Sequence, residues 1–375
     1  MSMYVPRLIE SALNNSTKSA LLLGPRQTGK STLIGKLKPE LTLNLADETL
    51  FVELSSDLQA FKDRVESRPY KTIFVDEIQR MPELLNLVQF YIDQRKGMRF
   101  YLTGSSARKL RRGGANLLPG RVINYFLGPL VAKEADYAFA TMAVLNYGTL
   151  PEIYSIEDEK SRQSILRSYS VSYLKEEIQH EALVRNLPSF ARFFHVACQS
   201  VGQLIDYTKI AKAAKVSRHS IPRFFEILED TMVATRIYPF EPAIESADLI
   251  KHPRFFLFDN GVFNGLLGNF NASIDRRGPL MEQLVFNQIK DSCGALEKSF
   301  KASTFRTRGG LEIDFIFEVE GDTIAVEVKS SDNIQSEDLR GLKSFPNHYP
   351  RKHLSMVLHA GSREIKKEGI WCLPL

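Results

Sequence analysis

The chain of 375 residues is too long for one ordinary domain and long enough to bury two or three separate cores. Apolar residues make up 43% and charged residues 25%, which is typical of a soluble globular protein and excludes a disordered or membrane-embedded chain. The net charge of +5 permits contact with nucleic acid but is too small to require it.

The N-terminal segment Met1–Glu10 lacks an apolar signal core, and no run of about 18 apolar residues follows it. We therefore expect a cytoplasmic protein without a membrane partner. The cysteines lie far apart and show no CxxC spacing, so neither a zinc site nor a disulfide framework is expected. They are Cys198, Cys293 and Cys372.

From residue 20 to about residue 130, short apolar strands alternate with stretches of helical length, which predicts a parallel sheet covered by helices. The expected strands are Ala20–Leu23, Leu41–Leu45, Thr72–Val75 and Arg99–Leu102. We place this first α/β domain at residues 1–140.

An eight-residue segment after the first strand fits the P-loop pattern, in the strand-to-helix context that the pattern requires. It consists of Gly24, Pro25, Arg26, Gln27, Thr28, Gly29, Lys30 and Ser31, and Thr32 follows it. Its backbone N–H groups would surround phosphate oxygens, while Lys30 would reach the terminal phosphates and the Ser31 hydroxyl would bind Mg²⁺. The segment predicts a site for ATP with Mg²⁺.

Acidic residues follow the apolar strand Thr72–Val75, at the edge where open α/β sheets bind their ligands. We expect Asp76 to hold Mg²⁺ and Glu77 to act as general base on the attacking water. The next strand ends in small polar residues, where Ser105 and its neighbour Ser106 could sense the γ-phosphate or form a plain polar turn.

Arginines follow this strand, at Arg108, Arg111, Arg112 and Arg121. Arg121 is our candidate arginine finger, which would stabilise the transferring phosphoryl group across a subunit interface of a homo-oligomer. The alternative is an ordinary surface arginine in a salt bridge.

Helical periodicity dominates residues 141–240, which we expect to contain two helices in a helix-turn-helix arrangement followed by a wing strand at Ala234–Tyr238. Pro222 is tolerable only in the first turn of the second helix. The basic residues on these helices could contact DNA, or the element could instead contact protein. They are Lys209, Lys212, Lys215, Arg218, His219 and Arg223.

Residues 241–375 predict a third, mixed α/β domain with a helix near Leu280–Asp291. Its expected strands are Phe255–Phe258, Ala302–Arg306, Glu312–Glu318, Thr323–Lys329 and His353–Leu358. Asp259 ends the first of these strands, and we assign it to a turn in which Asn260 and Gly261 supply positive φ.

Charged residues could converge on neighbouring elements of this domain. Glu282 lies on the helix, Asp314 on one strand, and Glu327 and Lys329 share one face of the next strand. Such a group could bind a divalent cation and act on a phosphodiester. The alternative is an ordinary charge pattern on an edge strand.

The chain resembles one family of prokaryotic AAA-type ATPases that carry a C-terminal domain of unknown function. The resemblance lies in Leu22–Ser31, in Phe74–Arg80 with Gln79 after the acidic pair, and in the Leu102–Ser106 and Leu118–Arg121 segments. It covers nearly the whole chain, and it implies a P-loop ATPase core, a winged helix and a nuclease-like terminal fold.

The terminal domain resembles the PD-(D/E)xK nuclease core. In that resemblance Asp314 is the central aspartate, Glu327 and Lys329 form the ExK pair, and Glu282 is the helical acid. Ile313 replaces the proline that usually precedes the aspartate.

Two classes of function remain open. In the first, ATP turnover drives DNA binding or processing. In the second, the ATPase is a nucleotide-controlled switch whose other domains bind partner proteins and have no nuclease activity.

Overall fold

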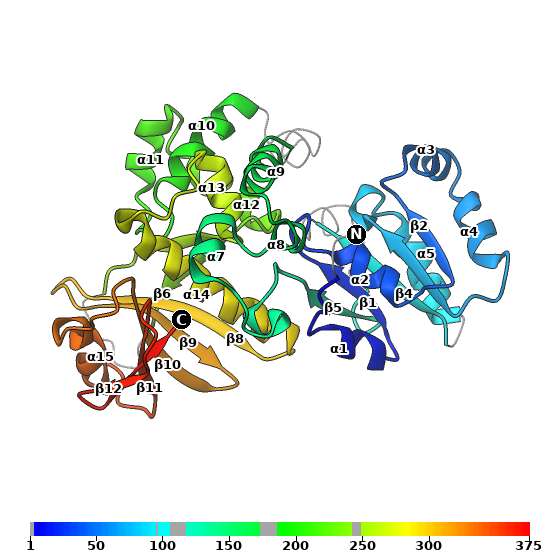
Figure 1. The fold of residues 1–375 in the computed structure, drawn as a ribbon. Helices are drawn as coiled ribbons and strands as arrows, with labels where there is room; N and C mark the ends of the chain where they lie inside the picture. The colour runs from blue at the N-terminus through cyan, green and yellow to red at the C-terminus, as the bar shows by residue number, and fades with distance from the viewer. Residues whose placement is uncertain (1–3, 95–96, 106–117, 173–185, 242–248) are drawn as a thin grey trace. The chain divides into compact units, whose positions relative to one another are not determined.

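The computed structural model describes residues 4–94, 97–105, 118–172, 186–241 and 249–375 (Figure 1). They form two compact units, which we describe separately. The first unit contains the described residues up to Leu130 together with Asp230–Val233. The second contains the described residues of Val131–Glu229 and Ala234–Leu375.

A five-stranded sheet forms the centre of the first unit, in the order β2-β3-β4-β1-β5, with every pair parallel. The strands are β1 (Ser19–Leu23), β2 (Leu41–Asn44), β3 (Thr72–Asp76), β4 (Arg99–Gly104) and β5 (Val122–Phe126). The predicted parallel α/β sheet is therefore confirmed, and β5 is a strand that we did not predict.

Helix α1 (Glu10–Asn15) precedes β1. The elements that connect the strands are α2 (Lys30–Lys36), α3 (Glu48–Ser56), α4 (Gln59–Glu66), the 3-10 turn η1 (Ile78–Arg80) and α5 (Leu84–Gln94). The core between sheet and helices contains Leu21, Ile73 and Phe100 from the strands, with Phe61 and Leu84 from the helices. Because β1 lies next to β4, and β4 next to β3, the carboxyl ends of these three strands meet at one edge.

An eight-stranded mixed sheet forms the second unit, in the order β12-β13-β11-β10-β9-β8-β6-β7. The strands are β6 (Ala234–Pro239), β7 (Arg254–Leu257), β8 (Phe300–Arg306), β9 (Glu312–Val319), β10 (Asp322–Lys329), β11 (Leu354–His359), β12 (Ile365–Lys367) and β13 (Ile370–Pro374). The strands expected after residue 250 are all present, shifted by one to a few residues at their ends.

The helices of the second unit are η2 (Ala132–Ala135), α7 (Thr141–Tyr147), α8 (Pro151–Ser155), α9 (Glu159–Ser172), α10 (Leu187–Cys198), α11 (Tyr207–Ala214), α12 (Ser220–Asp230), α13 (Asn260–Leu267), α14 (Ile274–Ala295), η4 (Glu337–Leu339), α15 (Arg340–Ser344) and η5 (Phe345–Asn347). Consecutive residues of β9 point to opposite faces of the sheet: Phe315 stacks on Phe286 of α14, while Ile316 shares a core with Leu342 of α15. The sheet is thus covered on both faces.

One local prediction in this unit is wrong. The chain does not turn with positive φ at Asn260 and Gly261, because α13 already begins at Asn260. Asp259 caps this helix, since its Oδ1 accepts a hydrogen bond from the Val262 amide at 2.9 Å and its Oδ2 accepts one from the Thr149 amide at 2.7 Å. Its role is structural, as expected, but as a helix cap.

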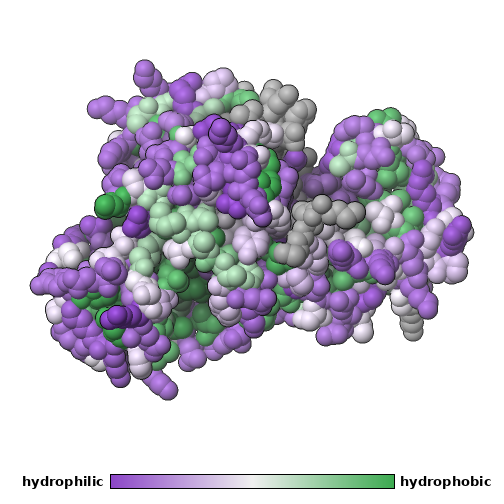
Figure 2. Space-filling model, viewed as in Figure 1, coloured by the Kyte–Doolittle hydropathy of each residue, from purple (hydrophilic) through white to green (hydrophobic). Residues whose placement is uncertain are grey.

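The face shown in Figure 2 is mostly hydrophilic, and hydrophobic residues gather in a hollow beside the C-terminus. An apolar cavity of about 370 Å³ in the second unit is lined there by residues of α7 and α14 and by Leu375. None of the predicted site residues lines it. Among the helices of the described residues, none is long and apolar enough to cross a membrane.

Candidate functional site

The loop after β1 is shaped by its glycines. A Cβ atom at Gly24 would lie 2.1 Å from the Leu127 carbonyl oxygen, so only glycine fits beside this backbone. Gly29 has φ of 89° and directly precedes α2, whose first residue is Lys30. The loop therefore leads directly into a helix N-terminus, which is a favourable position for a phosphate group.

The ammonium group of Lys30 is enclosed by the loop. It is 5% exposed and donates hydrogen bonds to the carbonyl oxygens of Gly24 at 2.9 Å and Pro25 at 2.7 Å. Thr28 is fully buried and its hydroxyl also donates to Pro25, at 2.9 Å. The lysine is thus positioned at the loop, where phosphate oxygens could replace the carbonyls as its partners.

A buried arginine that the sequence analysis missed supports this loop. The Arg7 guanidinium is 7% exposed and donates to the carbonyl oxygens of Thr28 at 2.7 Å, Gly128 at 2.8 Å and Pro129 at 3.0 Å. It thereby joins the P-loop to the chain that follows β5. No local pattern marks Arg7, because its partners lie up to 122 residues away.

Oxygen donors suited to Mg²⁺ meet at the end of β3. The Ser31 hydroxyl donates to Asp76 Oδ1 at 3.0 Å, and the Thr103 hydroxyl donates to the same oxygen. Asp76 is 7% exposed, while Ser31 is exposed at the surface of the loop. A hydroxyl and a carboxylate in contact beside a P-loop are the donors that a hard cation prefers, so these residues fit the expected ion.

Glu77 has a left-handed backbone, with φ of 57°, and its amide donates to Asp76 Oδ1 and to Thr103 Oγ1, each at 3.2 Å. The Gln79 amide group donates both to the Glu77 carboxylate and to Ser105 Oγ, the latter at 3.1 Å. The structure therefore brings the predicted residues Glu77 and Ser105 together through Gln79.

Gln79 fits here because Gly104 has no side chain: a Cβ atom at Gly104 would lie 2.9 Å from Gln79 Oε1. That oxygen is buried and has no hydrogen-bond partner among the described residues.

Arg121 forms a surface ion pair within the first unit. Its Nε donates to Asp93 Oδ1 at 2.7 Å and its Nη2 to Asp93 Oδ2 at 2.9 Å, and the hydrogen bond from Arg121 lowers the pKa of Asp93. The pair matches the salt-bridge alternative, and a finger role would require it to open. Ser106, Arg108, Arg111 and Arg112 lie outside the described residues.

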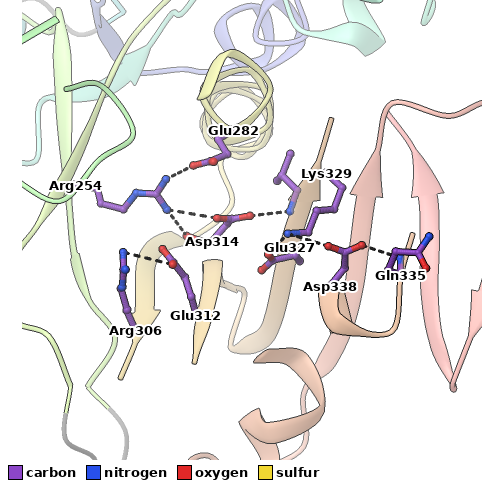
Figure 3. A network of polar contacts seen from close by, with 10 residues as sticks. Arg254, Glu282, Arg306, Glu312, Asp314, Glu327, Lys329, Gln335 and Asp338 are labelled. Carbon is purple, nitrogen blue, oxygen red and sulfur yellow. Dashed lines mark hydrogen bonds and ion pairs between the residues drawn. The ribbon is translucent and has the colours of Figure 1, made fainter. Parts of the chain in front are cut away.

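The second unit contains a cavity of about 800 Å³ whose lining includes all the predicted residues of the terminal domain. Glu282 comes from α14, Asp314 from β9, and Glu327 and Lys329 from β10, so the expected convergence is present (Figure 3). Asp314 Oδ2 accepts a hydrogen bond from the Val328 amide at 2.9 Å, which ties β9 to β10 at the cavity.

Burial dominates the electrostatics of these acids. It raises the pKa of Glu282 and of Glu327 to about 8, with the charge of Asp314 adding to the effect, and it also raises the pKa of Asp314. Lys329 Nζ lies 2.8 Å from Glu327 Oε1, whereas Glu327 Oε2 is buried without a hydrogen-bond partner in the described part of the chain.

A second arginine that we missed lies among these acids. Arg254 of β7 is 5% exposed, and its guanidinium pairs with Glu282 and lies 3.6 Å from Asp314 Oδ1. Within the described ranges, no group of three His, Cys, Asp or Glu side chains is arranged to hold a metal ion. The carboxylates of Glu282 and Asp314 therefore do not form a metal site while the Arg254 guanidinium lies against them.

Most of the predicted basic residues of this region are exposed, but only Lys209 and Lys212 lie on α11, whereas Lys215, Arg218 and His219 lie in the turn between α11 and α12. Arg223 is partly exposed and pairs with Glu226 at 3.2 Å, and Pro222 lies in the first turn of α12. The following strand β6 pairs with β7 and also with β8, so it continues into the eight-stranded sheet.

Comparison with known families identifies three matching regions. Residues 16–135 match the model of an AAA domain. The first unit has an AAA ATPase-like fold. Residues 140–273 and 277–375 match two models that are each described as a domain of unknown function, DUF8612 and DUF4143.

Two relatives of this chain carry no activity in their names. An uncharacterized protein of Mycobacterium tuberculosis is 24% identical over 313 residues, which cover 82% of this chain and 69% of the relative. An uncharacterized protein of Haemophilus influenzae is 24% identical over 361 residues, covering 87% of this chain and 85% of the relative. Among solved structures, the replication initiator DnaA bound to AMPPCP and single-stranded DNA is 12% identical, with a TM-score of 0.28, covering 59% of this chain and 86% of its own.

Proposed function

We propose that the first unit binds ATP with Mg²⁺ and hydrolyses it. The observation that carries this proposal is the 3.0 Å contact between the Ser31 hydroxyl and Asp76 beside the P-loop. Backbone amides of the loop and the Lys30 ammonium would hold the phosphates, and Ser31 and Asp76 would hold the cation. Bound Mg²⁺ neutralises the charge that develops on the phosphate oxygens.

Glu77 takes the role of general base in this proposal, because it directly follows Asp76 at the end of β3 and its carboxylate accepts a hydrogen bond from the Gln79 amide group. Gln79 would orient the carboxylate toward the attacking water. Ser105, which shares the Gln79 amide at 3.1 Å, would transmit the presence of the γ-phosphate to this pair.

The test compares nucleotide binding and turnover by variants of the full chain. Lys30→Ala should abolish ATP binding, whereas Glu77→Gln should bind ATP but stop turnover. Glu53→Gln is a matched control, because Glu53 is an exposed acid of α3 whose partner is Arg64 of α4. Wild-type turnover by Glu77→Gln would show that another group activates the water.

We further propose that the ATPase acts as a homo-oligomer on DNA, with Arg121 as a finger toward a neighbouring subunit. The exposed basic residues of α11 and of the turn before α12 support a winged-helix contact with phosphates, and the acidic cavity around Asp314 supports a PD-(D/E)xK-like terminal domain. Binding would fall steeply with salt, and Lys212→Ala with Lys215→Ala should weaken it for all sequences alike.

The competing proposal is a nucleotide-controlled switch whose second unit binds partner proteins. The ion pairs in the wall of the cavity favour this second proposal. Arg254 and Lys329 already pair with Glu282 and Glu327, which a nuclease would use to bind a cation. A DNA-binding titration at several salt concentrations separates the two proposals. Absence of salt-dependent binding in every nucleotide state would leave the switch.

A further inference from the structure

Arg254 is held in the terminal cavity from several sides. Its guanidinium pairs with Glu282, lies 3.6 Å from Asp314 Oδ1, and donates to the carbonyl oxygens of Gly202 and, at 3.5 Å, Asp314. Figure 3 shows it lying between the Glu282 side chain from the helix and the Asp314 side chain from the strand. The ring of Phe256 lies 5.4 Å below its charge.

The other charges that line this cavity are paired separately. Arg306 lies 3.4 Å from Glu312, and Lys329 lies 2.8 Å from Glu327 and 3.5 Å from Asp338. Arg254 is therefore the ion-pair partner of Glu282, while the charge of Asp314 is stabilised by Arg254 and, more weakly, by Lys329. A buried carboxylate without such a partner would be strongly destabilised.

We propose that Arg254 is the resident cation of the terminal cavity, and that a divalent cation binds Glu282 and Asp314 only after the guanidinium has left them. The inference rests on the proposed PD-(D/E)xK-like terminal site, whose regulation it describes. Two cations cannot share these oxygens, because the guanidinium would lie within a few ångströms of the metal charge. In its resting state the cavity is closed to metal.

Glu327 supplies the second observation that points to a cation. Its Oε2 atom is buried in the cavity wall without a hydrogen-bond partner among the described residues, although Lys329 engages Oε1. This unsatisfied oxygen would serve as a further ligand of the ion, while the oxygens of Glu282 and Asp314 become available only when Arg254 moves. Release of Arg254 is therefore the first change that metal binding at this site requires.

The test counts Mn²⁺ bound to nucleotide-free full chain from the loss of the electron paramagnetic resonance signal of the free ion. Wild type should show no site that depends on Asp314. Arg254→Gln should gain one such site per chain, because the repulsion is removed and two carboxylates are left to be neutralised. Arg254→Lys keeps a cation and should gain no site.

Two controls identify the gained site. Arg306→Gln removes a guanidinium of the same cavity that pairs with Glu312, and it should bind Mn²⁺ as wild type does. Asp314→Asn added to Arg254→Gln should lose the gained site. Circular dichroism of each variant reports whether it is folded.

Asp314-dependent Mn²⁺ binding by wild type would overturn the inference, and this measurement stands even if Arg254→Gln does not fold. A folded Arg254→Gln that gains no site would also overturn it. DNA cleavage is assayed separately: a gained Mn²⁺ site without cleavage would keep the inference and refute nuclease activity.

Discussion

The buried Arg7 gives the sharpest prediction about the P-loop. Arg7→Ala removes hydrogen bonds of 2.7, 2.8 and 3.0 Å to the carbonyl oxygens of Thr28, Gly128 and Pro129. Hydrogen bonds to a charged group contribute about 1.5–3 kcal/mol each, and part of the loss is recovered when water enters the space. We therefore expect the free energy of unfolding of the first unit to fall by about 3–5 kcal/mol.

The same substitution should weaken ATP binding, because Thr28 belongs to the loop that would hold the phosphates. The assay is ATP turnover as a function of ATP concentration: KM should rise at least about tenfold, with a smaller change in kcat, because Arg7 positions the loop and does not touch the reacting atoms. Arg7→Lys should recover part of the affinity, since it keeps the charge but not the fork of donors.

Arg64→Ala is the matched control for this experiment. Arg64 also donates to a backbone carbonyl, that of Ala60 at 3.2 Å, but it lies at the surface and pairs with Glu53. Its loss should cost less than about 1 kcal/mol. If Arg7→Ala resembles Arg64→Ala in both KM and unfolding midpoint, Arg7 does not position the loop.

Three further predictions follow from the described contacts. Gln79→Ala should lower kcat while leaving ATP binding intact, because Gln79 orients the Glu77 carboxylate; an unchanged kcat would exclude this role. Arg121→Ala should lower turnover by about 10³-fold if Arg121 acts as a finger, whereas Asp93→Ala, which frees Arg121, should not; equal turnover by wild type and Arg121→Ala would exclude the finger. Burial raises the pKa of Asp259 from 3.8 to about 6, so the folded state holds the proton of this carboxyl more tightly than the unfolded state. Relative to Asp259→Asn, the free energy of unfolding of wild type should fall by roughly 3 kcal/mol as the pH rises from about 4 to above 6. An equal pH dependence of unfolding for wild type and Asp259→Asn across this range would contradict the shift.

Local sequence patterns carry the candidate nucleotide site. The P-loop and the acidic pair Asp76–Glu77 are each encoded within a few consecutive residues, and the apolar strands before them are central in the sheet. The strands β5, β12 and β13 were not predicted. β5 and β12 lie at the edges of their sheets, where strands are commonly short or mixed in polarity, and β13 is a short strand that pairs with β12.

The missed arginines have a different cause. Arg7 and Arg254 are single basic residues in ordinary local sequence, and their partners lie far along the chain. Only the fold shows that Arg254 faces Glu282 and Asp314. The sequence suggested a divalent cation among these acids, and that interpretation left out a cation supplied by the chain itself.

The wrong prediction at Asn260–Gly261 came from reading this pair as a turn signal. Gly261 is needed for a different reason: its Cβ atom would lie 2.0 Å from the Tyr147 carbonyl oxygen, so the start of α13 packs directly against another backbone. Close approach and positive φ select the same residue, and the sequence alone could not separate them.

The central claim, that the first unit hydrolyses ATP with Glu77 as base, is tested most directly by one comparison. Phosphate release from ATP is measured for purified wild type and Glu77→Gln, with Mg²⁺ and with a chelator, while bound nucleotide is quantified in the same samples. We predict Mg²⁺-dependent release by wild type, and by Glu77→Gln retained ATP with no release. Release by Glu77→Gln at the wild-type rate, or wild-type protein that binds no nucleotide, would contradict the claim.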